Sequence, residues 1–530
     1  MAYDLIIRGG RVFDGSGSPW YRADVAVHEG RIAHVAPHIC TADARKVIDA
    51  TDLAVCPGFI DPHSHDDSAP LVDPYNLGRL SQGVTTVIAG NCGYSLFPVT
   101  DSGRSALASL VAPIGFCADL NWSTCSDMAG KMFENGSAVN IAYLVGHNAV
   151  RVAVMQTDDS EPTREQLGEM KCFIEEAMKE GAFGFSTGLI YVPGVFSDTP
   201  EIVELTRAIK PFGGVYVTHM RDEADNIRDA LCEAITVARE AGVPVHIAHA
   251  KISGRDNWGR AGEVLDVVSK ARDQGIDVTL DAYPYTAGAS FLASALPPFV
   301  KGGGDDAMMK RLKEPEIRAK VKHYINERTD WQNWPKQMGT WDCFVVGISP
   351  KTPEYEGKSI SEIAQMRGAD PVDTLMDIVA VTGHSATAVL FMMNEEDVQR
   401  FIASPLVMVG TDAPPPSERT IPHPRGFGTY AKVLGRYARE QGILSMEEAI
   451  RKMSSMPAIR FNLQSKGLVR EGFDADLVVF DPDTVADNAT YTEPDKLATG
   501  FEHVLVGGVV AFSSGKPTGE LPGRWVVHKR

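Results

Sequence analysis

From about residue 59 to about residue 462, short β-rich runs alternate with longer segments that carry helix signals. Strands and helices that alternate in this way are typical of βα units, which assemble into a parallel sheet. Thr163 and Gln166, for example, have the spacing of a capping box, and Gly181 predicts the end of that helix. We count eight strand-like runs, the number that closes a (β/α)8 barrel. The runs are 59–60, 84–88, 141–145, 184–186, 215–218, 245–248, 278–280 and 406–409.

The two ends of the chain differ from its middle in their pattern of secondary-structure signals. Both ends contain β-hairpin signals, and each is too short to make a separate all-β domain. We therefore predict one small β-sandwich built from both termini, residues 1–56 and 463–530, with the barrel inserted between them at 57–462. A ninth strand candidate, 386–391, is assigned with residues 299–393 to an insertion over the barrel mouth.

Charge and cysteine usage narrow the class of partner and compartment. The net charge of -18 argues against a nucleic acid or an anionic membrane as the general partner. The N-terminal residues have no basic region followed by a long apolar run, and no apolar stretch approaches the roughly 20 residues that span a bilayer. The eight cysteines are scattered without a CxxC pair, which predicts free thiols in a reducing cytoplasm. The sequence does not indicate an oligomeric state.

Residues that can bind a metal follow five of the predicted strands. His63 and His65 end the first run, and residues i and i+2 of an extended chain point to the same side. A lone strand-end histidine is more often a hydrogen-bonded structural residue, and we assign such a supporting role to His147 and His246. Six candidates at the carboxyl ends of barrel strands instead favour a metal site. They are His63, His65, Cys92, His219, His249 and Asp412.

Longer motifs surround these positions. They are PGFIDPHSHDD at 57–67, GNCG at 90–93, GAFGFSTGLIYVPG at 181–194, DAYPYTAG at 281–288, GTDA at 410–413, HPRGFGTY at 423–430 and the closing KGLVREGFDADLVVFDP. With these motifs the sequence resembles the D-aminoacylase (N-acyl-D-amino-acid deacylase) branch of the amidohydrolase superfamily over nearly the whole chain. The resemblance implies an α/β fold, a TIM-like metal-dependent hydrolase barrel with a flanking β-sandwich. It also implies zinc-dependent hydrolysis of the amide bond of N-acyl-D-amino acids, which are small-molecule substrates.

The resemblance extends to the metal ligands. A thiolate with two imidazoles leaves a fourth tetrahedral position for water, which is the open arrangement of a catalytic zinc site. Asp412 is then expected to be the general acid/base that takes the proton of the water and delivers it to the leaving nitrogen. The implied ligands are Cys92, His219 and His249 for one tightly bound Zn²⁺, with a weaker second position near His63, His65, Cys92 and Asp412.

The substrate also needs a site for its α-carboxylate. The resemblance places this role on Lys251, Tyr283 and Arg425, with Tyr191 and Ser290 as fainter candidates. Arginine offers a bidentate fork to a carboxylate, and lysine and tyrosine add single donors.

The side-chain preference of the substrate stays open between acidic and apolar. Residues 290–345 contain apolar runs together with several cations, among them Lys301 and Lys310. The sequence does not place these groups around a substrate.

Two other functions compete with this reading. Cyclic-amide hydrolases of the hydantoinase or dihydroorotase kind bridge two metals with a carboxylated lysine, but the run 184–188 carries no lysine. That difference weakens the cyclic-amide reading and leaves the metal count open between one and two. A non-catalytic scaffold of the same architecture would show gaps in its ligand set, whereas every expected position is filled here.

Overall fold

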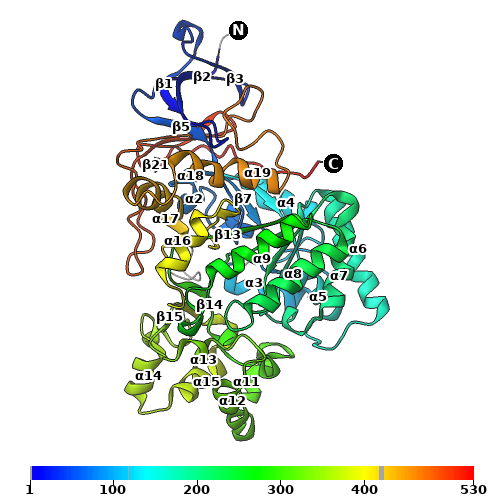
Figure 1. Ribbon diagram of the computed structural model, residues 1–530. Helices are drawn as coiled ribbons and strands as arrows, with labels where there is room; N and C mark the ends of the chain where they lie inside the picture. The colour runs from blue at the N-terminus through cyan, green and yellow to red at the C-terminus, as the bar shows by residue number, and fades with distance from the viewer. Residues whose placement is uncertain (1–2, 117–118, 417–422, 530) are drawn as a thin grey trace.

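The computed structural model describes residues 3–529, apart from 117–118 and 417–422. Eight parallel strands form a closed barrel in its middle (Figure 1). The third strand is interrupted at Leu144, and the last strand returns to the first through a parallel bridge between Ser64 and Ala413. In order around the barrel the strands are β6 (Phe59–Asp61), β7 (Val84–Ala89), β8 (Asn140–Tyr143) with β9 (Val145–Gly146), β10 (Gly184–Gly188), β11 (Val215–His219), β12 (Val245–Ile247), β13 (Val278–Ala282) and β17 (Val407–Val409).

Helices cover the outside of the barrel, so its strands are buried on both faces and read as continuous apolar runs. The predicted capping box is confirmed: the Thr163 hydroxyl accepts from the Gln166 backbone, and the helix ends at Gly181 in a left-handed conformation. The helices are α1 (Ala69–Val72), α2 (Leu77–Leu80), α3 (Arg104–Val111), α4 (Cys125–Met132), α5 (His147–Met155), α6 (Arg164–Glu180), α7 (Thr199–Thr206), α8 (Ile227–Ala241), α9 (Ala261–Asp273), α16 (Glu395–Ala403), α17 (Arg425–Lys432), α18 (Met446–Met453) and α19 (Ser455–Arg460).

The two ends of the chain share one β domain. Strand β5, from the N-terminal part, lies between β1 and β18, so residues far apart in sequence pair directly. Val25, Leu477 and Leu505 pack in the core of this domain. Its strands are β1 (Leu5–Val12), β2 (Tyr21–His28), β3 (Arg31–Ala36), β4 (Val47–Asp49), β5 (Ala54–Pro57), β18 (Leu477–Phe480), β19 (Phe501–Val506), β20 (Val509–Ser513) and β21 (Lys516–Pro517).

A third group of elements lies at the end of the molecule away from β1–β3 (Figure 1). Its first element, β14, begins at Gly288, ahead of the predicted start at residue 299. The segment Gly-Ala-Ser-Phe has few of the residues that signal a strand, so sequence patterns do not indicate β14. The ninth strand candidate is β16, which pairs with β14 and β15 and with no described barrel strand. The elements are β14 (Gly288–Phe291), α10 (Pro298–Lys301), α11 (Gly304–Arg311), α12 (Pro315–Glu327), α13 (Trp334–Met338), β15 (Phe344–Val346), α14 (Ile360–Arg367), α15 (Pro371–Thr382) and β16 (Thr387–Leu390).

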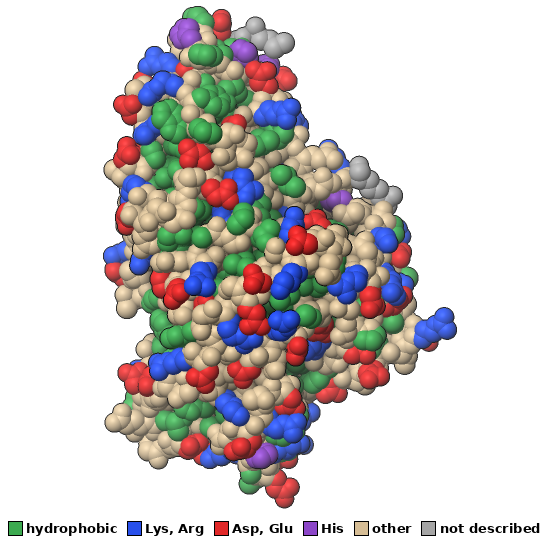
Figure 2. Space-filling model, in the orientation of Figure 1, with side chains coloured by type: hydrophobic (Ala, Val, Ile, Leu, Met, Phe, Trp, Pro, Cys, Tyr) green, Lys and Arg blue, Asp and Glu red, His purple; other side chains and the backbone are tan. Residues whose placement is uncertain are grey.

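The surface carries both signs of charge. On the face shown in Figure 2, basic and acidic side chains are interspersed and neither forms a broad single-sign patch. Within the described ranges, none of the helices has the length and apolar character needed to cross a membrane.

Candidate metal centre

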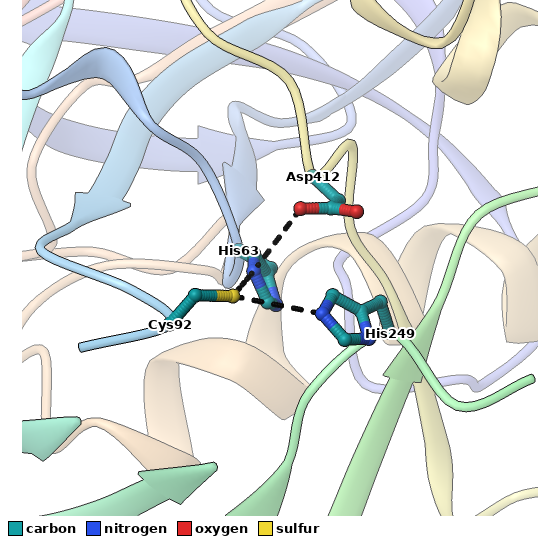
Figure 3. A group of neighbouring side chains, drawn as sticks. All are labelled: His63, Cys92, His249 and Asp412. Atoms are coloured by element: carbon teal, nitrogen blue, oxygen red, sulfur yellow. Dashed lines mark hydrogen bonds and ion pairs between the residues drawn. The ribbon is translucent and has the colours of Figure 1, made fainter. Parts of the chain in front are cut away.

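Four predicted residues meet where the barrel strands end. His63 follows β6, Cys92 follows β7, His249 follows β12 and Asp412 follows β17, and Figure 3 shows them turned toward one space. The Cys92 Sγ atom lies 3.3 Å from His63 Nε2 and 3.5 Å from His249 Nε2. His63 Nε2 is 3.4 Å from Asp412 Oδ1. Parallel strands bring their carboxyl ends to one rim, which is why residues so distant in sequence converge.

The two remaining candidates join the same cluster. His219, the last residue of β11, places Nδ1 2.8 Å from His249 Nε2 and 3.8 Å from Cys92 Sγ. His65 Nε2 lies 3.3 Å from Asp412 Oδ1. The structure therefore brings together all six residues that the sequence singled out as metal-binding or catalytic.

The spacing of the donor atoms fits a metal ion. Tetrahedral zinc, with bonds of about 2.0–2.3 Å, separates its ligand atoms by roughly 3.3–3.6 Å. The two distances from Cys92 Sγ, 3.5 Å to His249 and 3.8 Å to His219, are close to this range. The two histidine nitrogens, at 2.8 Å, would have to separate by about half an ångström. Cys92, His219 and His249 thus form a donor set of one thiolate and two imidazoles.

The backbone at this centre is strained. Cys92, His249 and Asp412 have φ angles of 54°, 34° and 51°, a region that residues other than glycine rarely adopt. Each such residue costs on the order of 1–3 kcal/mol, and such costs concentrate at functional sites. Glycines at 90 and 93 complete the turn: a Cβ on Gly90 would lie 2.2 Å from the Leu144 carbonyl oxygen, so no larger residue fits. The GNCG motif is therefore a turn that aims the Cys92 sulfur into the barrel mouth.

The charged groups of the cluster keep the side chains of Cys92 and Asp412 in their anionic forms. Burial alone would raise the pKa of Cys92, but His63 and His249 hold this pKa well below the ordinary value of a thiol. Burial would likewise raise the pKa of Asp412, and the Arg425 guanidinium with His249 holds it well below the usual range. A thiolate and a carboxylate are the charge states that bind a divalent cation, and the protons that the raised pKa values of His63 and His249 keep on these rings would be released when the imidazoles bind it.

Glu223 is a member of the site that the sequence analysis missed. Its buried carboxylate lies 3.0 Å from His249 Nδ1, 3.6 Å from His219 Nε2 and 2.7 Å from Lys251 Nζ. Although burial acts to raise it, Lys251 and His219 lower the pKa of Glu223 to about 2. A carboxylate behind metal-binding histidines fixes their orientation. Its position four residues after His219 is the one signal in the sequence that could have indicated it.

A second buried carboxylate holds the first histidine. Asp281 Oδ1 is 3.3 Å from His63 Nδ1 and 2.9 Å from His246 Nε2. Among the described residues, His246 therefore contacts the centre through Asp281 alone. His147 pairs with Glu201 at 2.9 Å and has no recorded contact with the cluster in the described part of the chain. Neither histidine lies among the six clustered residues, and the structural or supporting role predicted for them stays a prediction.

The three residues assigned to the α-carboxylate lie beside the cluster. Arg425 Nη1 is 2.6 Å from Asp412 Oδ2, and its guanidinium lies 5.0 Å from the centre of the Tyr283 ring. Neither Arg425 Nε nor the Tyr283 hydroxyl, both buried, has a hydrogen-bond partner among the described residues. Lys251 Nζ lies 2.6 Å from His249 Nδ1 and also pairs with Glu223. Two unpartnered donors in one place indicate a ligand that accepts hydrogen bonds.

Of the two fainter candidates, Tyr191 packs against His219 and Ser290 lies next to Tyr191. The Tyr191 ring is 5.0 Å from the His219 ring and 5.9 Å from the Phe291 ring, and the nearby Ser290 hydroxyl of β14 acts against the burial that raises the pKa of Tyr191. Tyr191 and Phe291 line a cavity of about 400 Å³. This cavity has the size of a small-molecule site.

Comparison with known proteins identifies the class. Residues 46–512 match the model of the amidohydrolase family, and the chain belongs to that family. Within it, the chain belongs to the N-acyl-D-amino-acid deacylase branch: it is 37% identical over 522 residues to a D-aminoacylase from Alcaligenes xylosoxydans xylosoxydans, covering 98% of this chain and 97% of the relative.

Solved structures of this branch superpose over the whole chain. A D-aminoacylase described as having a binuclear metal centre, with one-metal activation and second-metal attenuation, matches with a TM-score of 0.84 at 36% identity, covering 99% of each chain. An N-acyl-D-glutamate deacylase from Bordetella bronchiseptica, solved with zinc and a phosphonate mimic of the tetrahedral intermediate, matches with a TM-score of 0.84 at 32% identity, covering 100% of each chain. An L-hydantoinase from Arthrobacter aurescens reaches 0.55 at 17% identity, covering 99% of this chain and 100% of the hydantoinase, so it shares the fold alone. These likenesses confirm the predicted fold class and family.

Proposed function

We propose that the protein hydrolyses the amide bond of N-acyl-D-amino acids and releases a carboxylate and a free D-amino acid. The observation that carries this proposal is the convergence of Cys92, His219 and His249 beside the Asp412–Arg425 pair. Cys92, His219 and His249 would hold the ion, Asp412 would act on the water, and Arg425 would help to hold the substrate. The branch to which the chain belongs supports the linear amide over the cyclic one.

The metal would be zinc, held tightly by Cys92, His219 and His249. A weaker second position would lie near His63, His65 and Asp412, with Cys92 shared between the two. Thiolate and imidazole donors suit zinc, and a zinc ion bound there supplies a Lewis acid and makes hydroxide available near neutral pH.

Asp412 would move the proton. Its Oδ1 faces both His63 and His65, so it lies at the centre where water is activated, while its Oδ2 is held by Arg425 at 2.6 Å. A substrate α-carboxylate that takes over the guanidinium would leave Asp412 free to accept a proton from the water. Asp412 would then deliver that proton to the amide nitrogen as the C–N bond breaks.

Arg425, Tyr283 and Lys251 would hold the α-carboxylate. The unpartnered Arg425 Nε and Tyr283 hydroxyl supply two donors, and Lys251, which lies 2.7 Å from Glu223 and 2.6 Å from His249 Nδ1, would add one N–H. The carboxylate, the amide and the side chain of the substrate would then be fixed in three directions around one Cα. Only one enantiomer of the substrate would reach the reactive geometry. A displacement of about 1 Å can cost on the order of 10²-fold in rate.

The test is amine release from paired N-acetyl-D- and N-acetyl-L-amino acids. We expect hydrolysis of the D forms, with kcat/KM for the L forms at least roughly 10²-fold lower. Arg425→Met should raise KM and weaken that preference, whereas Arg436→Met, at an exposed arginine after α17, should leave both unchanged. Equal rates of hydrolysis for the D and L enantiomers, or a preference for the L enantiomer, would contradict the substrate assignment even if zinc were found at the centre.

We place the protein in the cytoplasm. The seven cysteines that the structure describes are all free thiols, three of them exposed, which suits a reducing compartment. Cell fractionation that recovered the protein outside the cytoplasm would contradict this placement.

A further inference from the structure

A buried lysine, Lys301, lines the cavity beside Tyr191, together with the carboxylates of Asp305 and Asp306. The cavity is about 400 Å³ in volume, and its lining runs from Tyr94, Tyr191 and Phe291 to Ser294 and Lys301. Because the Tyr191 ring packs against His219, one side of this cavity adjoins the metal centre. A substrate whose amide lies at the centre would therefore extend part of its body toward Lys301.

Lys301, the last residue of α10, has no partner for its charge. Its side chain is 3% exposed, yet no hydrogen bond, ion pair or aromatic ring face is recorded for it in the described part of the chain. Every other buried lysine or arginine among the described residues has at least one of these contacts. A charged residue that is only 3% exposed and has no partner for its charge favours a functional reason, and its Nζ keeps some access to solvent, unlike the fully buried Arg425 Nε.

A second cavity, of about 160 Å³, lies on the other side of Lys301 and is rich in hydrogen-bond donors. Trp331, Gln332 and Trp334 line it, and the indole N–H of each tryptophan and the Gln332 side-chain amide are buried without a partner among the described residues. Indole nitrogen can only donate, so the two indoles and the ammonium call for an acceptor, beyond the one that the unpartnered Gln332 Oε1 offers. A carboxylate satisfies several such donors at once.

We propose that Lys301 binds the carboxylate of an acidic substrate side chain, so that the preferred substrates are N-acyl-D-aspartate and N-acyl-D-glutamate. The inference rests on the proposed deacylase function and specifies its substrate class. The α-carboxylate is held on the Arg425 side of the centre, and the second carboxylate lies on the Tyr191 side. Burial lowers the pKa of Lys301 to about 8, so the ammonium is still present near neutral pH.

The test compares kcat/KM for N-acetyl-D-glutamate, N-acetyl-D-aspartate and N-acetyl-D-leucine. The unmodified protein should favour an acidic substrate. Lys301→Met, which keeps the length and removes the charge, should lower kcat/KM for the acidic substrate by roughly 10- to 100-fold and leave N-acetyl-D-leucine unchanged or improved. Lys301→Arg should retain most of the preference, and Lys310→Met, at an exposed lysine of α11, should change neither substrate.

N-succinyl-D-leucine identifies which part of the substrate carries the anion. This compound has its second carboxylate on the acyl group instead of the side chain. A Lys301-dependent preference for N-succinyl- over N-acetyl-D-leucine, without a preference for acidic side chains, would overturn the side-chain assignment.

The remaining outcomes separate the two proposals. A preference of the unmodified protein for N-acetyl-D-leucine, or an equal loss on all substrates in Lys301→Met, would overturn the role of Lys301 while the deacylase function stood. No hydrolysis of any N-acyl-D-amino acid by zinc-loaded protein would instead overturn the proposed function, and with it this inference. If Lys301→Met did not fold, the substrate preference of the unmodified protein would still decide the question.

Discussion

Glu223→Gln removes the negative charge that lies behind His219 and His249 and keeps the size of the side chain. The carboxylate contacts His249 Nδ1 at 3.0 Å, His219 Nε2 at 3.6 Å and Lys251 Nζ at 2.7 Å. Glutamine can still accept one hydrogen bond, but its amide nitrogen would face a donor. Lys251 would lose the one carboxylate with which it pairs in the described structure.

The variant should lose both zinc affinity and unfolding free energy. Removing a group that orients metal-binding histidines typically lowers metal affinity by about 10- to 100-fold. Breaking a buried ion pair from one side costs roughly 3–5 kcal/mol of unfolding free energy, because Lys251 stays buried with its charge. The variant should therefore bind zinc more weakly and melt at a lower temperature.

Glu201→Gln is the matched control. Glu201 is also buried and also pairs with a cation, Arg151 at 2.6 Å, and it contacts one histidine, His147 at 2.9 Å, where Glu223 contacts two, but it has no recorded contact with the metal centre in the described residues. It should lose stability and keep its zinc affinity.

The assay is zinc competition against a chelator of known affinity, with thermal unfolding of the metal-free proteins alongside. If the two variants lost zinc affinity equally, or neither did, the orienting role of Glu223 would be refuted. A loss of stability alone would not support that role.

Three further changes test the centre. Cys92→Ala should remove most bound zinc and nearly all activity with the fold intact by circular dichroism, and full metal occupancy with full turnover would contradict its ligand role. Asp412→Asn should keep the tightly bound ion and lower kcat at least about 10²-fold with a much smaller change in KM; near-normal kcat would assign the proton transfer to another group. The ratio of kcat/KM for N-acetyl-D-glutamate to that for N-acetyl-D-leucine should fall as pH rises through about 8, because Lys301 is charged below its pKa and neutral above it. A ratio constant from pH 6 to 10 would contradict the ion pair. The other charged groups that line the two cavities beside Lys301 are Asp305, Asp306, His384, Arg221 and Asp330.

The barrel could be predicted from sequence because its signal is local. Each strand is a short apolar run bounded by helix signals, and the capping box at Thr163 needs only residues three positions apart. The strand β14 was missed since its sequence, Gly-Ala-Ser-Phe, has almost no β propensity, and its pairing with β16 supplies the stability instead.

The residues of the site also fall into those that sequence patterns predict and those that they do not. His63, Cys92, His219, His249 and Asp412 could be found because all barrel strands end at one rim. Their roles as ligands or acid/base stay predictions until the variants are measured.

The groups that sequence could not place depend on three-dimensional contacts. Asp281 reaches His63 from a strand more than 200 residues away, and Lys301 lies between cavities lined by Phe291, Trp334 and His384. No local pattern encodes such neighbours.

The strained backbone at Cys92, His249 and Asp412 has an evolutionary consequence. Glycine adopts such φ angles freely, so glycine at any of these positions would relieve strain of about 1 kcal/mol or more and abolish the chemistry. One nucleotide change converts a cysteine or an aspartate codon into a glycine codon. A lineage that no longer needed the reaction could thus relieve the strain at Cys92 in a single mutational step, whereas glycine at Asp412 would also leave the buried Arg425 without its carboxylate and so lose more stability than it gains.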